Sequence, residues 1–205
     1  MHNNITEQLR ETYNASAQER EQSQQPQWQQ DIRAHFLSLL QQDGKQNLLE
    51  LGAGTGRDGK FFQGNGLDVL CTDLSPEMVQ LCQAKGLAAQ VMDFRAWDLP
   101  ENSFDAVYAF SSLLHVPKQD IRTVLAQIKS AMRPGALFFY GVYGGYTFEG
   151  IWEKDPLEPK RFYAYYTDDQ IQQLAGEFFE IVEFQEILLD PPGKRFHFQA
   201  LVLRK

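Results

Sequence analysis

The stretch from Asn47 to Asp58, NLLELGAGTGRD, constrains the fold of this chain more than any other part of the sequence. A short apolar run ends in three glycines, Gly52, Gly54 and Gly56, and a segment compatible with a helix follows. This order predicts a buried strand, a tight loop and a helix start. Glycines suit such a loop because a Cβ would keep the backbone away from a ligand, and because the turn needs positive φ angles. The unpaired N–H groups and positive dipole at the helix start then favour a polar or negatively charged small molecule.

A second signal is the acid that follows the next strand. The apolar run from Leu67 to Cys71 leads to Asp73, about twenty residues beyond the loop, where nucleotide-binding α/β folds use an acid to accept hydrogen bonds from a ribose. Together the two signals predict a cofactor that contains adenosine. The glycine spacing directly after the strand is G-x-G-x-G, whereas dinucleotide-binding folds use G-x-G-x-x-G, a pattern that occurs here only from Gly54 onward.

The stretch Glu50-Leu51-Gly52-Ala53-Gly54-Thr55-Gly56 resembles the first motif of the class I S-adenosylmethionine-dependent methyltransferases, of the type 11/25-like methyltransferase domain group. The stretch from Phe104 to Pro117 resembles the fourth motif of that family, which follows the central strand beside the transferred methyl group. The resemblance covers residues 45 to 140 by motif and the C-terminal part by architecture. It implies S-adenosylmethionine as cofactor and S-adenosylhomocysteine as product.

Hydrophobic periodicity predicts an α/β fold of the same kind. Apolar runs that alternate with helical patterns predict parallel strands at 48–51, 67–72, 87–92, 104–110 and 136–142. A helix follows, which a T-x-x-Q capping box from Thr167 predicts. After it come two strands, at 179–188 and 196–204, joined across Pro191-Pro192-Gly193. We therefore expect a Rossmann-like, seven-stranded, mostly parallel sheet with a C-terminal antiparallel hairpin and helices on both faces.

We expect one domain over residues 1–205, because this length suits a single core. Its expected parts are an N-terminal helical cap at 1–44, a cofactor-binding core at 45–142, an aromatic substrate-side insertion at 143–166, and a C-terminal helix and hairpin at 167–205. The alternative for the first segment is a frayed terminus.

The resemblance implies a set of cofactor-binding residues, most of them at the carboxyl ends of the predicted strands, where open α/β sheets bind ligands. Asp93 would accept a hydrogen bond from the adenine amino group and the N–H of Phe94 would meet a ring nitrogen. The other interpretation of this pair is a turn acid beside a packed ring. Tyr13 would lie near the methionine end, or else at the surface; the second tyrosine that the family usually has is absent, and Arg20 stands near its place. The full set is Tyr13, Glu50, Gly52, Ala53, Gly54, Asp73, Leu74, Met78, Asp93, Phe94, Phe110 and Ser111.

The acceptor side is less constrained by the sequence. His115 lies in the loop after the predicted strand 104–110, and a histidine has a pKa near neutral pH, so it is the candidate catalytic base. The alternative is a packing role. No catalytic triad is expected, because the methyl group of the cofactor is already activated. The connection 143–166 is dense in aromatic residues and predicts either a wall of the acceptor pocket or a cover for the sheet edge or a dimer contact. Its candidate substrate residues are Tyr143, Tyr146, Trp152 and Arg161.

Composition limits the partners. The net charge of −8 without a basic stripe disfavours nucleic acid, and the apolar runs are too short to span a membrane. Cys71 and Cys82 are expected to be reduced core residues, which favours the cytoplasm, and no spacing of ligand residues suggests a metal site. A homodimer stays open.

The sequence thus predicts a cytoplasmic methyltransferase that uses S-adenosylmethionine and acts on a small molecule by in-line displacement. The alternatives are an NAD(P)-dependent oxidoreductase, which the glycine spacing and the terminal hairpin disfavour, and a non-catalytic protein that binds S-adenosylmethionine. The acceptor atom, whether O, N, C or S, stays open.

Overall fold

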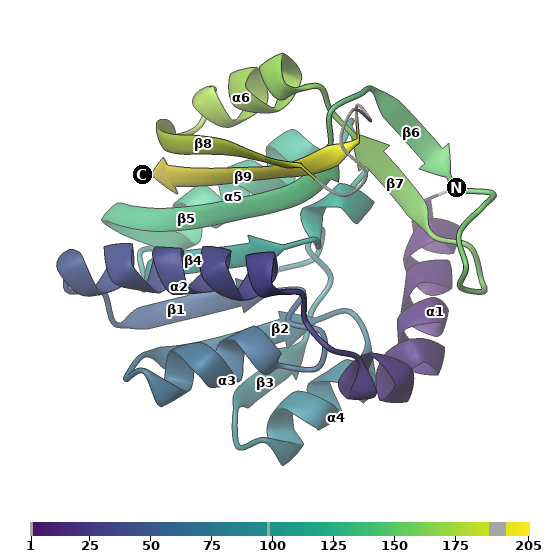
Figure 1. The fold of residues 1–205 in the computed structure, drawn as a ribbon, viewed down its shortest axis with the longest axis horizontal. Helices are drawn as coiled ribbons and strands as arrows, with labels where there is room; N and C mark the ends of the chain where they lie inside the picture. Colours follow the sequence, from purple (N-terminus) through teal and green to yellow (C-terminus); the bar gives the residue numbers. More distant parts are fainter. Residues whose placement is uncertain (1, 98, 189–195) are drawn as a thin grey trace.

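The fold is built on a central twisted sheet with helices on both faces (Figure 1). The computed structural model describes residues 2–97, 99–188 and 196–205. Within these residues the main sheet has seven strands in the order β3-β2-β1-β4-β5-β9-β8. Its first five strands in the chain run parallel: β1 (Asn47–Leu51), β2 (Asp68–Asp73), β3 (Ala88–Val91), β4 (Phe104–Phe110) and β5 (Met132–Gly144).

The C-terminal hairpin completes the sheet. Strand β9 (His197–Arg204) is antiparallel to both β5 and β8 (Glu180–Leu188). This arrangement confirms the predicted Rossmann-like fold class. The predicted turn Pro191-Pro192-Gly193 lies outside the described residues.

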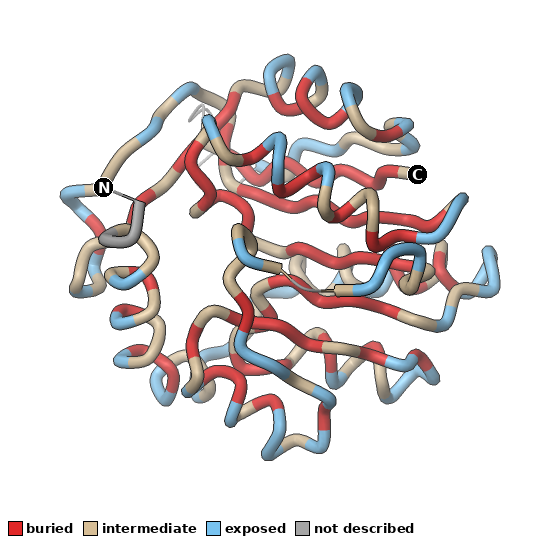
Figure 2. The backbone as a smooth tube through the Cα atoms, turned by 180° about the vertical axis from the view of Figure 1, so that it is seen from behind, coloured by how far each residue is buried: buried red, intermediate tan, exposed pale blue. Residues whose placement is uncertain are grey.

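The helices cover the sheet in two layers. On one face α2 (Gln27–Gln42), α3 (Arg57–Gly64) and α4 (Pro76–Ala84) contribute to an apolar cluster with alternate residues of β1, β2 and β4. On the other face α5 (Ile121–Ala131) and α6 (Asp168–Gly176) pack against the intervening residues. This division follows from the period of two along a strand, since successive side chains point to opposite faces. Figure 2 shows the resulting line of buried residues along the central strands.

The helix boundaries follow local chemistry. Ser75 caps α4, because its side chain accepts a hydrogen bond from the N–H of Met78 at 3.1 Å and Pro76 takes the first helical position. The predicted capping box between Thr167 and Gln170 is present at the start of α6.

One boundary prediction was wrong. The strand predicted at 136–142 begins earlier than expected, because β5 starts at Met132 and contains Arg133, Pro134 and Gly135. The register between β4 and β5 shifts between Phe104 and Ala106, opposite this segment, and Gly135 has φ +73°. A bulge of this kind accommodates a proline that lacks an N–H donor.

Two elements stand over the carboxyl ends of the parallel strands (Figure 1). One is α1 (His2–Gln22), a helix that buries Leu9, Thr12 and Ala17. The other is a hairpin of β6 (Phe148–Ile151) and β7 (Phe162–Tyr165), which gives the predicted aromatic insertion a regular antiparallel structure. No helix among the described residues is long and apolar enough to cross a membrane.

Candidate active site

The glycine loop joins β1 to α3 through three glycines in the left-handed region of backbone conformation. Gly52, Gly54 and Gly56 have φ angles of +71°, +54° and +79°, which L side chains rarely adopt. A Cβ on Gly52 would lie 2.4 Å from the Cβ of Ser112 in the loop after β4. The loop therefore requires glycine both for its conformation and for its close approach to the β4 loop.

Asp73 ties this loop to the end of β2. Its Oδ2 accepts a hydrogen bond from the N–H of Gly54 at 2.8 Å, and its Oδ1 accepts one from the N–H of Ser75 at 2.9 Å. Burial raises the pKa of Asp73, and the two N–H donors offset part of that rise. The carboxylate thus holds the loop in place, and it keeps further lone pairs for hydrogen bonds at the cavity that Asp73 lines, described below.

Glu50 lies below the loop and is almost fully buried. Burial, followed by the nearby charge of Asp58, raises the pKa of Glu50 well above its usual range. The thiol of Cys71 donates to its Oε2 at 3.2 Å. Cys71 and Cys82 are both free and buried.

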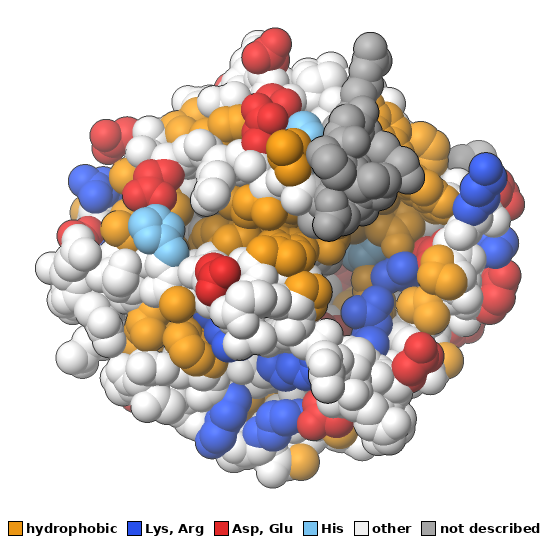
Figure 3. All heavy atoms as spheres, viewed as in Figure 1, with side chains coloured by type: hydrophobic (Ala, Val, Ile, Leu, Met, Phe, Trp, Pro, Cys, Tyr) orange, Lys and Arg blue, Asp and Glu red, His pale blue; other side chains and the backbone are white. Residues whose placement is uncertain are grey.

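A cavity of about 560 Å³ lies at the carboxyl ends of the parallel strands. It is bounded on one side by the glycine loop and on the other by α1 and the residues around β7, and its size is typical of small-molecule sites. Figure 3 shows the molecule hollowed here, with hydrophobic and basic side chains around the hollow. Every residue that the sequence analysis placed around the cofactor lines this cavity: Tyr13, Glu50, Gly52, Ala53, Gly54, Asp73, Leu74, Met78, Asp93, Phe94, Phe110 and Ser111.

Asp93 has a local partner at the edge of the cavity. Its Oδ1 accepts from the N–H of Arg95 at 2.9 Å, and its Oδ2 pairs with Arg95 Nη2 at 3.0 Å. The adenine role of Asp93 and Phe94 stays a prediction, which the position of both residues on the cavity wall permits.

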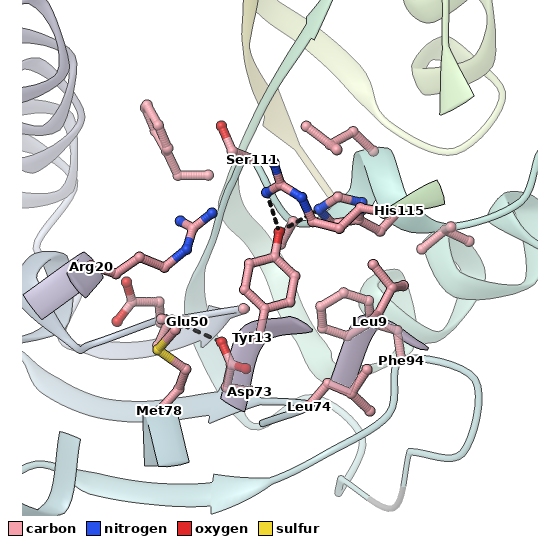
Figure 4. A pocket seen from close by; sticks show the side chains of 18 of the residues that line it. Leu9, Tyr13, Arg20, Glu50, Asp73, Leu74, Met78, Phe94, Ser111 and His115 are labelled. Atoms are coloured by element: carbon pink, nitrogen blue, oxygen red, sulfur yellow. Dashed lines mark hydrogen bonds between the residues drawn. The ribbon is translucent and has the colours of Figure 1, made fainter. Parts of the chain in front are cut away.

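Tyr13 and His115 meet across the cavity (Figure 4). The Nδ1 of His115 lies 2.7 Å from the carbonyl oxygen of Phe162, which can only accept, so Nδ1 carries the proton. Nε2 is then an acceptor, and the hydroxyl of Tyr13 donates to it at 2.6 Å. Burial, with the charges of Arg161 and Arg20, lowers the pKa of His115 to about 3 against the opposing hydrogen bond to Phe162. The imidazole is therefore neutral near pH 7.

Arg161 is held by a carboxylate that the sequence analysis missed. Asp155 accepts from Arg161 Nε at 2.7 Å and from Nη2 at 2.9 Å, and its side chain is 0% exposed. Burial raises the pKa of Asp155, but the Arg161 side chain and the N–H groups of Leu157 and Arg161 outweigh it and lower the pKa to about 2. The remaining nitrogen of Arg161, Nη1, donates to the hydroxyl of Tyr13 at 3.3 Å.

The aromatic insertion is divided between the cavity and the surface behind it. Tyr143, Tyr163 and Tyr165 line the cavity together with Phe196. Tyr146 and Trp152, both predicted to contact substrate, are not among the lining residues; their ring centroids lie 5.6 Å from that of Tyr165, on which they pack. The substrate role of Tyr146 and Trp152 stays a prediction; both rings pack on Tyr165, which lines the cavity.

Several polar groups at the cavity have no partner among the described residues. They include the buried Nε of Arg20 and the buried hydroxyls of Ser111 and Ser112. The guanidinium of Arg20 lies 4.9 Å from the ring centroid of Tyr13, and Ser111 has φ +54°. Buried polar atoms of this kind are costly without a partner, so they favour a polar ligand in the cavity.

A separate group of potential ligand atoms lies between α6 and the terminal hairpin. Atoms of Asp168, Glu186 and His197 lie within 4.8 Å of one another. Asp168 Oδ1 already accepts from His197 Nε2 at 2.8 Å and from Gln199 at 2.7 Å, so the cluster is accounted for as a hydrogen-bond network.

Comparisons with known proteins agree with this geometry. Residues 48–135 match the family model described as "Methyltransferase domain". A sterol 24-C-methyltransferase of Gibberella zeae is 38% identical over 69 residues, which are 34% of this chain and 17% of that protein. A ubiquinone biosynthesis O-methyltransferase of Xanthomonas axonopodis pv. citri is 27% identical over 115 residues, 53% of this chain and 47% of that protein. The chain thus spans less than half the length of these curated relatives.

Solved structures share the fold over most of the chain. The 1,6-didemethyltoxoflavin-N1-methyltransferase of Burkholderia thailandensis has a TM-score of 0.71 at 23% identity and covers 96% of this chain and 87% of its own. A methyltransferase from Methanosarcina mazei has a TM-score of 0.69 at 17% identity, over 78% and 92% of the two chains. The sheet order, the glycine loop and the cavity at the strand ends define a Rossmann-like small-molecule-binding fold. Residues 48–135 match a methyltransferase domain, and the chain as a whole shares the fold of solved S-adenosylmethionine-dependent methyltransferases.

Proposed function

We propose that this chain transfers a methyl group from S-adenosylmethionine to a small-molecule acceptor by in-line displacement and leaves S-adenosylhomocysteine. The observation that carries the proposal is that the glycine loop, Asp73 and the Tyr13–His115 pair all face one cavity. The relatives support it, because the Burkholderia structure is described with S-adenosylhomocysteine and 1,6-didemethyltoxoflavin bound.

The residues around the glycine loop fit such a cofactor. Asp73 has one N–H donor on each carboxylate oxygen and keeps further lone pairs for ribose hydroxyls. Arg20 offers an unpartnered guanidinium nitrogen for the carboxylate of the amino-acid end. We assign the adenine edge to Asp93 and Phe94, and a face of the adenine pocket to Met78.

When bound, S-adenosylmethionine supplies a methyl group activated by a positively charged sulfur. The protein then has to align the acceptor and remove a proton if the acceptor carries one. We assign proton removal to His115, whose Nε2 lone pair faces Tyr13. Tyr143 and Arg161 are the proposed acceptor contacts, and Tyr146 and Trp152 support the hairpin from behind.

The broader assignment is a cytoplasmic enzyme that acts on small molecules and has no nucleic acid partner. The net charge of −8 supports the last point, and the free buried cysteines support a reducing compartment. Residues 1–44 cover the cofactor and residues 143–166 form the acceptor side. A homodimer is compatible with this assignment.

A titration with two cofactors tests the proposal. Isothermal calorimetry with S-adenosylhomocysteine should give saturable heat at a 1:1 ratio, whereas NADH should give none. Saturable binding of NADH, or no heat with S-adenosylhomocysteine in protein that shows a cooperative unfolding transition, would contradict the proposal. The non-catalytic alternative predicts the same binding but no conversion of S-adenosylmethionine with any acceptor class, including the one inferred next.

A further inference from the structure

The acceptor side of the cavity carries no uncompensated charge among the described residues. Arg161 is paired on two nitrogens with Asp155, and the neutral imidazole of His115 adds no charge near pH 7. Arg20 lies near Tyr13, with its guanidinium 4.9 Å from the ring centroid. The proposed function pairs this charge with the carboxylate of the cofactor, so it is not left as a counter-ion for the acceptor. A charged acceptor would therefore enter this side without a counter-ion, at a large desolvation cost.

Aromatic rings form the wall of the same side. Tyr143 and Phe196 stack with centroids 5.5 Å apart and planes inclined by 10°. Tyr165 meets Phe196 at 5.5 Å, and the ring of Tyr163 lies 4.9 Å from that of His115. Rings of this kind favour a flat ligand that can stack or meet them edge to face.

The polar groups here form one directed chain. Arg161 Nη1 donates to the oxygen of Tyr13, and the hydroxyl of Tyr13 donates to Nε2 of His115. A phenol oxygen has one proton to donate and two lone pairs to accept with. One lone pair of Tyr13 receives Arg161, so the other is available to an O–H or N–H group of a ligand.

We infer, building on the proposed function, that the methyl acceptor is an uncharged flat aromatic or heteroaromatic molecule with a ring-bound O–H or N–H group that donates to the hydroxyl oxygen of Tyr13. Tyr13 is then a relay between the acceptor and His115, rather than only a contact to the cofactor. This inference excludes carboxylates, phosphates and alkylammonium compounds as acceptors.

The step balances in atoms and charge. The acceptor heteroatom forms a bond to the methyl carbon while the carbon–sulfur bond breaks and its electron pair stays on sulfur. The acceptor proton moves to the Tyr13 oxygen as Tyr13 gives its own proton to Nε2 of His115. One positive charge is lost at sulfur and one is gained at the imidazole, so the buried site holds the same net charge before and after. His115 releases the proton to water when the product leaves.

Three naphthalene derivatives with one ring system test the acceptor class: 2-naphthol, 2-methoxynaphthalene and 2-naphthoate. Their binding to the full chain saturated with S-adenosylhomocysteine is measured by ligand-observed NMR. We expect 2-naphthol to bind about tenfold more tightly than the other two, which is about the gain from one good hydrogen bond. Tyr13→Phe should reduce the affinity for 2-naphthol to that for 2-methoxynaphthalene, while Tyr146→Phe, outside the cavity, should keep the preference.

The outcomes separate this inference from the proposed function. Three results overturn the inference alone, provided that S-adenosylhomocysteine binds saturably. They are the lack of a preference for 2-naphthol, no binding of any of the three compounds, and tighter binding of 2-naphthoate. A preference that survives Tyr13→Phe also overturns it. No binding of S-adenosylhomocysteine to the folded protein overturns the proposed function and this inference with it.

Discussion

The hydroxyl of Tyr13 in α1 lies 2.6 Å from Nε2 of His115, although the two residues are 102 positions apart in the chain. The same helix is held to the opposite side of the cavity, where Lys85 pairs with Glu21 at 2.8 Å and Arg57 donates to the carbonyl oxygen of Glu21 at 2.7 Å. Helix α1 therefore joins the glycine-loop side to the hairpin side. A ligand in the cavity contacts parts of the chain that are far apart in sequence.

The pH dependence of the free energy of unfolding should reveal whether burial keeps His115 neutral. Its folded pKa of about 3 lies below the unfolded value, so between these values the unfolded chain binds more protons than the folded chain. The contribution of His115 to the free energy of unfolding is therefore fully present above the unfolded pKa, about 6.5. It falls as the pH drops toward 3, by up to about 1.4 kcal/mol per pH unit. Urea unfolding at pH 7, 6 and 5 should show this loss in the wild type and not in His115→Gln.

A matched control for that experiment is His35→Gln, which removes an exposed histidine on α2 that pairs with Glu183. The loss between pH 7 and pH 5 should persist in this variant, because His115 is unchanged in it. An equal slope in the wild type and in His115→Gln would show that His115 is not held neutral by burial.

Substitution of Gly52 should damage both the loop and cofactor binding. In Gly52→Ala the new Cβ would meet Ser112 at 2.4 Å in a conformation with φ +71°, which we expect to lower stability by about 1–3 kcal/mol. Binding of S-adenosylhomocysteine should weaken at least about tenfold, because the loop shifts at the ligand. The control is Gly64→Ala in α3, where a Cβ would meet nothing within 4 Å; it should bind as the wild type does.

Breaking the Asp155–Arg161 pair should cost far more than breaking an exposed pair. Asp155→Asn leaves the buried guanidinium without its counter-charge, and we expect a loss of about 3–5 kcal/mol in urea unfolding. Glu177→Gln, which breaks the exposed pair with Arg122, should change stability by less than about 1 kcal/mol. Similar losses in the two variants would mean that the Asp155 pair is not a buried structural element.

The position of several cavity residues at the strand ends could be predicted from the sequence because local patterns fix them. A glycine loop after a buried strand, and an acid after the next one, must lie together once parallel strands end at one edge of the sheet. Gly52, Asp73 and Phe110 line a single cavity for this reason. The remaining members of the set, such as Tyr13 and Asp93, came from the resemblance to the methyltransferase family.

The acceptor side could not be predicted in the same way. Tyr146 and Trp152 lie just before and just after strand β6, and both pack on Tyr165, which itself lines the cavity. The pairing of Arg161 with Asp155, like the approach of Arg20 to Tyr13, depends on how distant segments fold over the strand ends. Composition alone indicated an aromatic cover but not which of its members face a ligand.

The most direct test of the account concerns Asp73. Calorimetric titration with S-adenosylhomocysteine should compare the wild type, Asp73→Asn, and Asp68→Asn at the exposed start of the same strand. Because hydrogen bonds to a charged group contribute about 1.5–3 kcal/mol, we predict that Asp73→Asn binds about 10 to 100 times more weakly and that Asp68→Asn binds as the wild type does. Equal affinity in all three folded proteins, or no binding by the wild type, would contradict the claim that this cavity holds the cofactor.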